Sequence, residues 1–150
     1  MKKAQLSTEY LIVLAVVLVL VLVVVGILGG FPSLGVQAKE SQSASYWSAA
    51  NPLSIKTYKA SGTSLDLVFA NRLSESITLQ SISLGTGAAV FSTATTFGPG
   101  EEKKVTATLA TACGTVGAAF DYSNVTMTYD KGSVTSLKQT GTVDLIGKCS

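Results

Sequence analysis

The side chains that could do chemistry in this chain are carboxylates and two cysteines, because its 150 residues include no histidine. The most suggestive acidic pair is Glu101–Glu102, but Lys103–Lys104 follows directly, which is typical of a solvated turn. The sequence contains no phosphate-binding loop, no Cys-x-x-Cys pair and no nucleophile elbow. The spacing of a calcium-binding loop is not met by Asp66, Asp121, Asp130 and Asp144. We therefore expect no enzymatic activity, no metal site and no cofactor.

One carboxylate stands in unusual surroundings. Glu9 precedes an almost unbroken apolar run from Leu11 to Leu28, which is interrupted only by Gly26. An ionised carboxylate out of water is costly unless it is paired. A generic membrane anchor has no use for such a group, so the sequence predicts a specific partner for Glu9.

The apolar run itself predicts a membrane helix. Residues 11–28 are close to the length that a helix needs to cross the bilayer core. The run is apolar on every face, so the helix must be surrounded by lipid or by other apolar helices. In hydrocarbon only a helix satisfies its backbone within a single segment.

A second helical stretch is expected beyond this run. The apolar pattern breaks at Gly29–Gly30, and Pro32 favours a kink or a fresh helix start. Residues 33–50 have a rough helical spacing that ends before Asn51–Pro52. Tyr46–Trp47 could pack this end onto the following domain. A partly ordered stalk is the alternative.

The remaining residues, 51–150, have the pattern of a β domain. Apolar and polar residues alternate in short segments, which predicts six to eight strands joined by regular turns. The parity of the alternation switches near Gln80–Ser81 and near Ser123–Asn124, so we expect a β-bulge at each place. Phe97–Glu101 predicts a type II turn and Asp130–Gly132 a hairpin. The predicted fold class is α+β, with a long N-terminal hydrophobic helix followed by an antiparallel, immunoglobulin-like β-sandwich.

Two further features concern covalent chemistry. Cys113 and Cys149 both lie in the β-rich region, and they can oxidise if that region is outside the cell. Only one pairing is possible, and closing this loop would stabilise the fold by about 4 kcal/mol; two unrelated buried thiols are the alternative. Asn124 begins an N-glycosylation sequon, Asn-Val-Thr, although such triplets also occur by chance.

The segment KKAQLSTEYL, residues 2–11, resembles the class III signal sequence of archaeal type IV pilins. That family has a short basic leader, cleavage just before a Gln, and a Gln-x-Ser-x-Glu block before the hydrophobic helix. Gln5, Ser7 and Glu9 match this block position for position. The resemblance is strong over the first thirty residues and weak over the β domain, where the Pro99–Glu101 turn and the paired cysteines also look like such pilins.

The resemblance implies a prepilin. A membrane-embedded prepilin peptidase would cut between Ala4 and Gln5 and remove the leader, residues 1–4. Residues 5–50 would then form the filament core as a hydrophobic helix with a kinked extension, and residues 51–150 the extracellular β-sandwich domain. The subunit would wait in the cell membrane and then polymerise with copies of itself into an adhesion filament on the cell surface. An assembly ATPase and a platform protein are further implied partners, and such pilins are often glycosylated.

Cleavage would create the partner that Glu9 requires. Gln5 would become the new N-terminus, and a free α-amine has a reference pKa near 8. Glu9 lies four residues further along, about 6 Å up a helix axis. It could neutralise this amine within its own subunit or on a neighbour already in the filament. Negative charge is also favoured near a helix N-terminus.

Three alternatives stay open. An uncleaved chain would be a membrane-anchored binding module. Cleavage after Ala38, where Val36-Gln37-Ala38 could serve as a small-x-small site, would release a secreted enzyme or carbohydrate-binding protein. An archaeal flagellum subunit shares the cleaved-helix design, although the Gln5–Glu9 block favours a pilus. Nucleic acid is not an expected partner, because the lysines are scattered and form no basic stripe.

Overall fold

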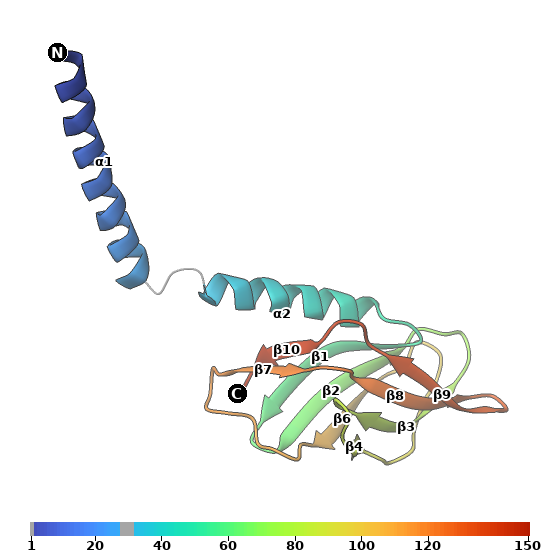
Figure 1. Ribbon diagram of the computed structural model, residues 1–150. Helices are drawn as coiled ribbons and strands as arrows, with labels where there is room; N and C mark the ends of the chain where they lie inside the picture. The colour runs from blue at the N-terminus through green and yellow to red at the C-terminus, as the bar shows by residue number, and fades with distance from the viewer. Residues whose placement is uncertain (1, 28–31) are drawn as a thin grey trace. The chain divides into compact units, whose positions relative to one another are not determined.

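The computed structural model describes the backbone of residues 2–27 and 32–150, and the side chains of residues 8–27 and 35–150. Two helices precede ten strands in this part of the chain (Figure 1). The chain divides into two compact units, one ending at Gln37 and the other comprising Ala38–Ser150. The α+β class is therefore confirmed, with an N-terminal apolar helix followed by antiparallel sheets.

The two predicted helices are both present. Helix α1 covers Lys2–Ile27 and contains nearly all of the apolar run. Helix α2 covers Pro32–Ala49 and ends before Asn51–Pro52, as predicted, so the alternative of a partly ordered stalk is wrong. Proline is favoured in the first turn of a helix, where a missing N–H costs nothing. Gly29 and Gly30, where the apolar pattern breaks, fall outside the described residues, and the kink between the two helices stays a prediction.

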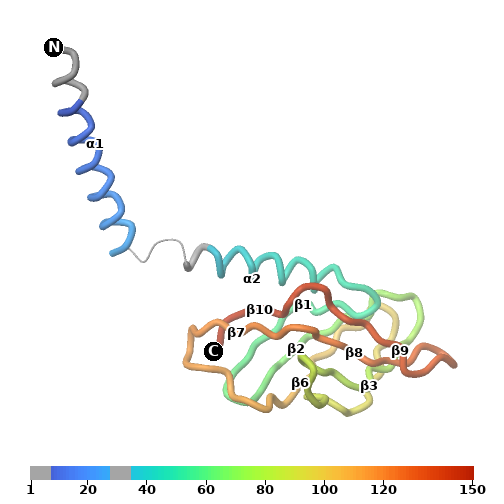
Figure 2. Tube along the Cα trace, viewed as in Figure 1, coloured from blue at the N-terminus to red at the C-terminus, as the bar shows by residue number. Residues whose placement is uncertain are grey.

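The strands form three antiparallel sheets. The first has the order β1-β2-β6, with β1 at Leu53–Ser61, β2 at Ser64–Asn71 and β6 at Glu102–Thr108. In the second, β4 (Ala89–Phe91), β3 (Ile77–Ser83), β8 (Thr126–Lys131) and β9 (Val134–Thr140) are neighbours in that order. Strand β5 (Thr95–Phe97) also pairs with β3. The third sheet pairs β10 (Leu145–Lys148) with β7 (Ala119–Tyr122), and β10 also lies beside β1 (Figure 2).

One predicted bulge is present and the other is not. The pairing of β3 with β8 shifts register between Leu79 and Ser81, which confirms the first bulge. At Ser123–Asn124 the chain instead passes from β7 in one sheet to β8 in another, so the prediction of a bulge there is wrong. The change of parity arises because the chain changes sheets. The total of ten strands exceeds the prediction because β4 and β5, at three residues each, are too short to show alternation.

Both predicted turns are confirmed. In the turn before β6, the Glu101 N–H donates to the Gly98 carbonyl (3.1 Å), and Gly100 has the positive φ, +69°, that a type II turn requires at its third position. The hairpin between β8 and β9 turns at Gly132, whose φ is +57°.

A single apolar core lies beneath all three sheets, and it extends to α2. The buried residues of β2 alternate along the strand as predicted, and Phe69 contacts Phe97 edge to face with ring centroids 6.3 Å apart. Trp47 of α2 belongs to the same cluster. The β unit therefore begins at Ala38, and the predicted boundary at residue 51 cuts off a helical segment that packs with the strands.

Candidate functional site

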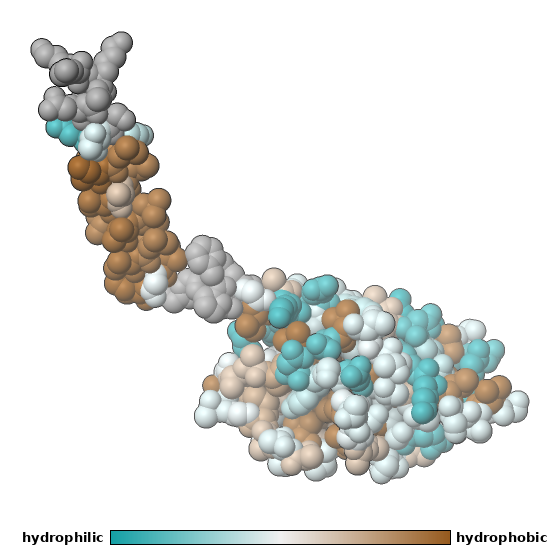
Figure 3. Space-filling model, viewed as in Figure 1, coloured by the Kyte–Doolittle hydropathy of each residue, from teal (hydrophilic) through white to brown (hydrophobic). Residues whose placement is uncertain are grey.

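Helix α1 presents an apolar surface on every side. Its span Thr8–Ile27, 20 residues, is long and apolar enough to cross a membrane, and none of it is buried within the chain. Figure 3 shows this hydrophobic surface running along the helix. The large aliphatic side chains from Leu11 to Val24, and that of Ile27, are about half exposed or more. Such a surface needs lipid or other apolar helices around it.

The acidic group stands at the N-terminal end of that surface. Glu9 is the one charged residue of the span, and its side chain is exposed. The predicted cleavage site, Ala4 and Gln5, and the predicted processing motif, Gln5, Ser7 and Glu9, all lie on α1. Gln5 and Glu9 are four positions apart and so share one face of the helix, one turn from each other. The side chains of Ala4, Gln5 and Ser7 fall outside the described part of the structure.

Helix α2 is joined to the β unit by a buried serine. The Ser43 hydroxyl donates to the carbonyl of Asp144 (2.7 Å) and accepts from the N–H of Ile146 (3.0 Å). Strand β10 pairs with β7 through its other edge. Ser43 thus satisfies backbone groups that a neighbouring strand would otherwise bind. No sequence signal identifies it, because a serine within a weakly periodic helix carries no pattern.

Tyr46 and Trp47 pack this helix onto the β unit, as the sequence predicted. Trp47 is fully buried, and its ring lies so close to Gly141 that a Cβ there would overlap it. The Tyr46 ring meets Trp47 edge to face at 5.2 Å, and its hydroxyl accepts from the N–H of Thr142 (3.1 Å). A residue larger than glycine at position 141 would therefore displace the helix or its tryptophan.

The end of α2 is capped by Arg72, which no motif in the sequence identifies. Its Nη1 donates to the Ser48 carbonyl (3.0 Å), and its backbone N–H donates to the Pro52 carbonyl (2.9 Å). A cation at a helix C-terminus complements the negative end of the helix dipole. Together with Ser43 and Trp47, this contact fixes the last two turns of α2 to the strands.

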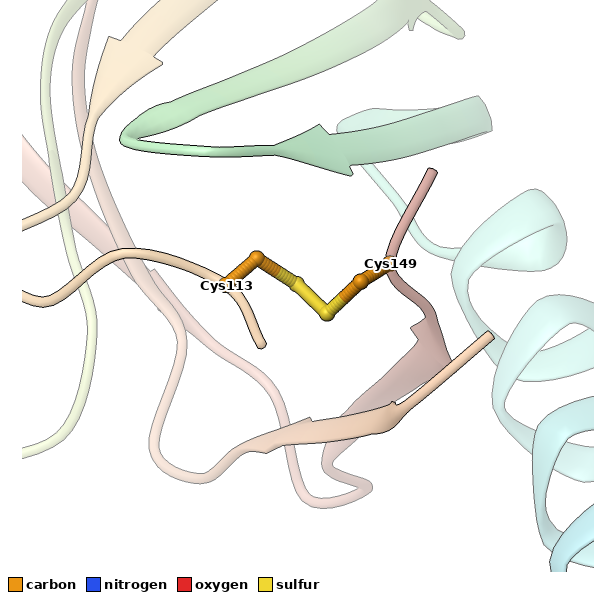
Figure 4. The surroundings of a disulfide bond; sticks show 2 residues. All are labelled: Cys113 and Cys149. Carbon is orange, nitrogen blue, oxygen red and sulfur yellow. A yellow bond between two sulfur atoms is a disulfide. The ribbon is translucent and has the colours of Figure 1, made fainter. Parts of the chain in front are cut away.

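The predicted disulfide is confirmed. Cys113 and Cys149 are bonded, with Cα atoms 5.8 Å apart, and lie 36 positions apart in the sequence (Figure 4). The bond joins the loop after β6 to the end of β10. Nearby backbone bonds act on the same segment, since Cys149 N–H donates to Ala118 O (2.8 Å) and Ser150 N–H to Ala60 O (2.9 Å). The last residues of the chain are therefore held on two sides.

The sequon lies on the surface. Asn124 is exposed in the connection between β7 and β8, where its φ is +48°. An exposed asparagine outside a strand is accessible to a modifying enzyme. Occupancy by a glycan stays a prediction.

The acidic pair at 101–102 serves a turn. The Glu101 carboxylate accepts from the Gly98 N–H (2.7 Å) and pairs with Lys103 (3.0 Å), and these two contacts hold the pKa of Glu101 below its usual range. Asp66 likewise pairs with Lys104 (2.7 Å) and accepts from the Thr106 hydroxyl (2.7 Å), which lowers its pKa. Within the described residues, no group of three or more His, Cys, Asp or Glu side chains could hold a metal ion.

Comparison of the chain with protein-family models, with curated proteins and with solved structures found no match in any of the three.

Proposed function

We propose that this chain is the subunit of an extracellular filament of the archaeal type IV pilus kind. Before assembly α1 holds the subunit in the cell membrane, and a prepilin peptidase removes residues 1–4. An assembly ATPase and a platform protein then transfer the subunit into a helical homopolymer on the cell surface. Adhesion is the role that such a filament serves.

The exposed apolar surface of α1 carries this proposal. A span of 20 residues that is apolar on every face, with none of its residues buried, needs apolar surroundings. Lipid provides them before assembly, and the α1 helices of other subunits provide them in the filament. Helix association in lipid rests on packing and polar contacts, so one surface can serve both states.

Glu9 marks one position on this otherwise uniform apolar surface. Buried in a filament core, its carboxylate would be costly unless it is paired. Cleavage before Gln5 supplies an α-amine one helical turn away, in the same subunit or in a neighbour. We propose that this pairing favours docking of each new subunit at one position along the core.

The β unit suits the outside of a filament. Its disulfide fits an oxidising compartment, and the exposed Asn124 fits a glycosylated surface. We propose that the β1-β2-β6 sheet and the sheet built on β3 and β8 are the two layers of an immunoglobulin-like sandwich. The single core cluster to which both sheets contribute supports this arrangement.

The N-terminal residue of the protein isolated from its cells tests the processing step. We expect Gln5. Met1 would indicate a membrane-anchored binding module, and Lys39 a secreted product. Sedimentation of material sheared from the cell surface then separates a polymer from a monomer, and a monomeric product beginning at Gln5 would overturn the filament.

The variant Glu9→Gln tests the role of the acidic side chain, because glutamine keeps its size and removes its charge. We expect the yield of sheared filaments to fall at least tenfold, the equivalent of about 1.4 kcal/mol per docking step. Glu102→Gln is the matched control, since Glu102 is an exposed carboxylate on the β unit. Wild-type filament yield from Glu9→Gln cells would refute the pairing.

A further inference from the structure

A cleft of about 430 Å³ lies in the β unit where the middle of α2 meets β1, β7 and β10. Glu40 and Ala44 line it from α2, and Lys56, Lys59 and Lys148 line it from the strands. The cleft thus brings three of the chain's lysines, well separated in the sequence, around one hollow. We call it the lysine cleft.

The three lysines are available to an external anion. Each is exposed, and none forms an ion pair with another described residue. Three other lysines of the β unit do form such pairs, namely Lys103, Lys104 and Lys131. Glu40 is the acidic side chain that lines the cleft, and Asp66, opposite Lys59 in the β1–β2 register, is engaged by Lys104. Ser150 also lines the cleft, so its main-chain carboxylate is a second negative group, and the three lysines outnumber the two.

One wall of the cleft is aromatic and fixed in place. The Tyr58 hydroxyl donates to the Ile146 carbonyl (2.6 Å), and the Tyr58 ring contacts Phe120 edge to face with centroids 6.2 Å apart. Both rings pack on Gly147, where an added Cβ would lie 2.6 Å from Phe120 Cζ and 3.0 Å from Tyr58 Cε2. An aromatic wall beside three ammonium groups fits an amphipathic ligand with an anionic head.

Chain length places the lysine cleft within reach of the membrane surface. Glu40 is separated from Ile27, the last residue of α1, by residues 28–39 alone. The step from Ile27 to Pro32 spans at most about 18 Å when fully extended. The eight helical steps from Pro32 to Glu40 add about 12 Å. Glu40 therefore lies within about 30 Å of the end of α1, whatever the angle between the two helices.

We propose that the lysine cleft binds the anionic headgroup of a membrane phospholipid while α1 is held in the bilayer. The phosphate accepts hydrogen bonds from the lysine ammonium groups, and the glycerol end lies against Tyr58 and Phe120. The inference rests on the proposed function in one respect, that α1 is the membrane-embedded segment of the unassembled subunit. The β unit is then held at the membrane surface until the subunit leaves for the filament.

Paramagnetic relaxation of the full chain in lipid nanodiscs tests this docking. One set of nanodiscs contains phosphatidylcholine alone, and the other contains phosphatidylcholine and phosphatidylglycerol at seven to three, each with a trace of headgroup-labelled paramagnetic lipid. We expect enhanced relaxation at Lys56–Lys59 and Lys148 in the anionic nanodiscs only. Each lysine near an anionic surface contributes roughly a fivefold factor to binding. The combined variant Lys56→Gln/Lys59→Gln/Lys148→Gln should therefore abolish the enhancement.

The matched control is Lys103→Gln/Lys131→Gln/Lys138→Gln, which removes the same charge from elsewhere on the β unit and leaves the Lys104–Asp66 ion pair intact. If the relaxation enhancement is lost equally in both triple variants, net charge alone explains it, and the lysine cleft is not the lipid-binding site. Enhancement that is equal in neutral nanodiscs would also overturn it, as would shifts of the cleft amides produced by inorganic phosphate without any lipid dependence. Enhancement that grows with protein concentration would assign the cleft to a second copy of the chain instead.

A separate flotation experiment tests whether α1 anchors the chain in a membrane. The chain should float with phosphatidylcholine vesicles, which lack net charge, because α1 alone suffices for insertion. Absence of flotation would refute the membrane-held state in the proposed function. The lysine cleft would then be tested by flotation of the same chain, and of both triple variants, with phosphatidylglycerol vesicles.

Discussion

Replacement of Ser43 by alanine tests whether α2 is an integral part of the β unit. The change removes two hydrogen bonds, to the Asp144 carbonyl and from the buried Ile146 N–H. A buried donor left unsatisfied costs about 1–3 kcal/mol, and loss of the part-buried acceptor adds about 1 kcal/mol. We therefore expect Ser43→Ala to lower the free energy of unfolding by about 2–4 kcal/mol, a large share of the about 5–15 kcal/mol that stabilises a typical domain.

Urea unfolding of the full chain in neutral detergent micelles measures this change. Trp47, the one tryptophan of the chain, is buried at the same contact and reports unfolding by its fluorescence. Ser45→Ala is the matched control, because Ser45 is an exposed serine of the same helix; we expect its effect to stay within about 0.5 kcal/mol. If the two variants unfold at the same urea concentration, the Ser43 hydroxyl does not fix the helix and the reasoning is wrong.

Three further changes test other contacts. Asn71 is buried and its amide donates to three backbone carbonyls, so Asn71→Ala should lower the free energy of unfolding by about 2–4 kcal/mol; an unchanged melting temperature would contradict this. The double variant Cys113→Ser/Cys149→Ser should lose about 4 kcal/mol on the chain-entropy model, and non-reducing denaturation that matches the wild type would exclude that contribution. The carboxylate of Glu101 has a pKa lowered from about 4.5, chiefly by the Gly98 N–H, so its stabilising effect is complete above pH 4.5 and is lost as the pH falls through the lowered value. Glu101→Gln should flatten this acid limb of the stability curve, and parallel curves for the two proteins would refute the assignment.

Features with strong local signals could be predicted from the sequence. The apolar run predicted α1, and Pro32 together with Asn51–Pro52 bounded α2 because proline restricts the backbone on both sides. The glycines made the turn before β6 and the hairpin at Gly132 recognisable in the sequence. In the structure Gly100 and Gly132 have the positive φ that glycine adopts readily. The disulfide followed from the presence of only two cysteines, since no other pairing exists.

Features that depend on tertiary contacts were missed. Ser43 and Arg72 matter because of the backbone groups that happen to face them, and nothing in their neighbours along the chain indicates those partners. The connection at Ser123–Asn124 was mistaken for a bulge because a change of sheet and an inserted residue both reverse the parity of alternation. The start of the β unit at Ala38 was missed because its helix shows almost no amphipathic pattern.

The contacts around β10 also determine how the molecule would bear mechanical load. A pull applied from the N-terminal end of α2 meets the buried Ser43 contact before Trp47 and Arg72, so part of it enters β10 between Asp144 and Ile146. That strand is paired with β7, and its far end is covalently joined to Cys113. Tension is thus divided between a ladder of hydrogen bonds and a covalent bond that does not yield. Strand β10 would therefore carry load at its edge of the β unit, and the hydrogen bonds of the other strands would not break one after another from that edge.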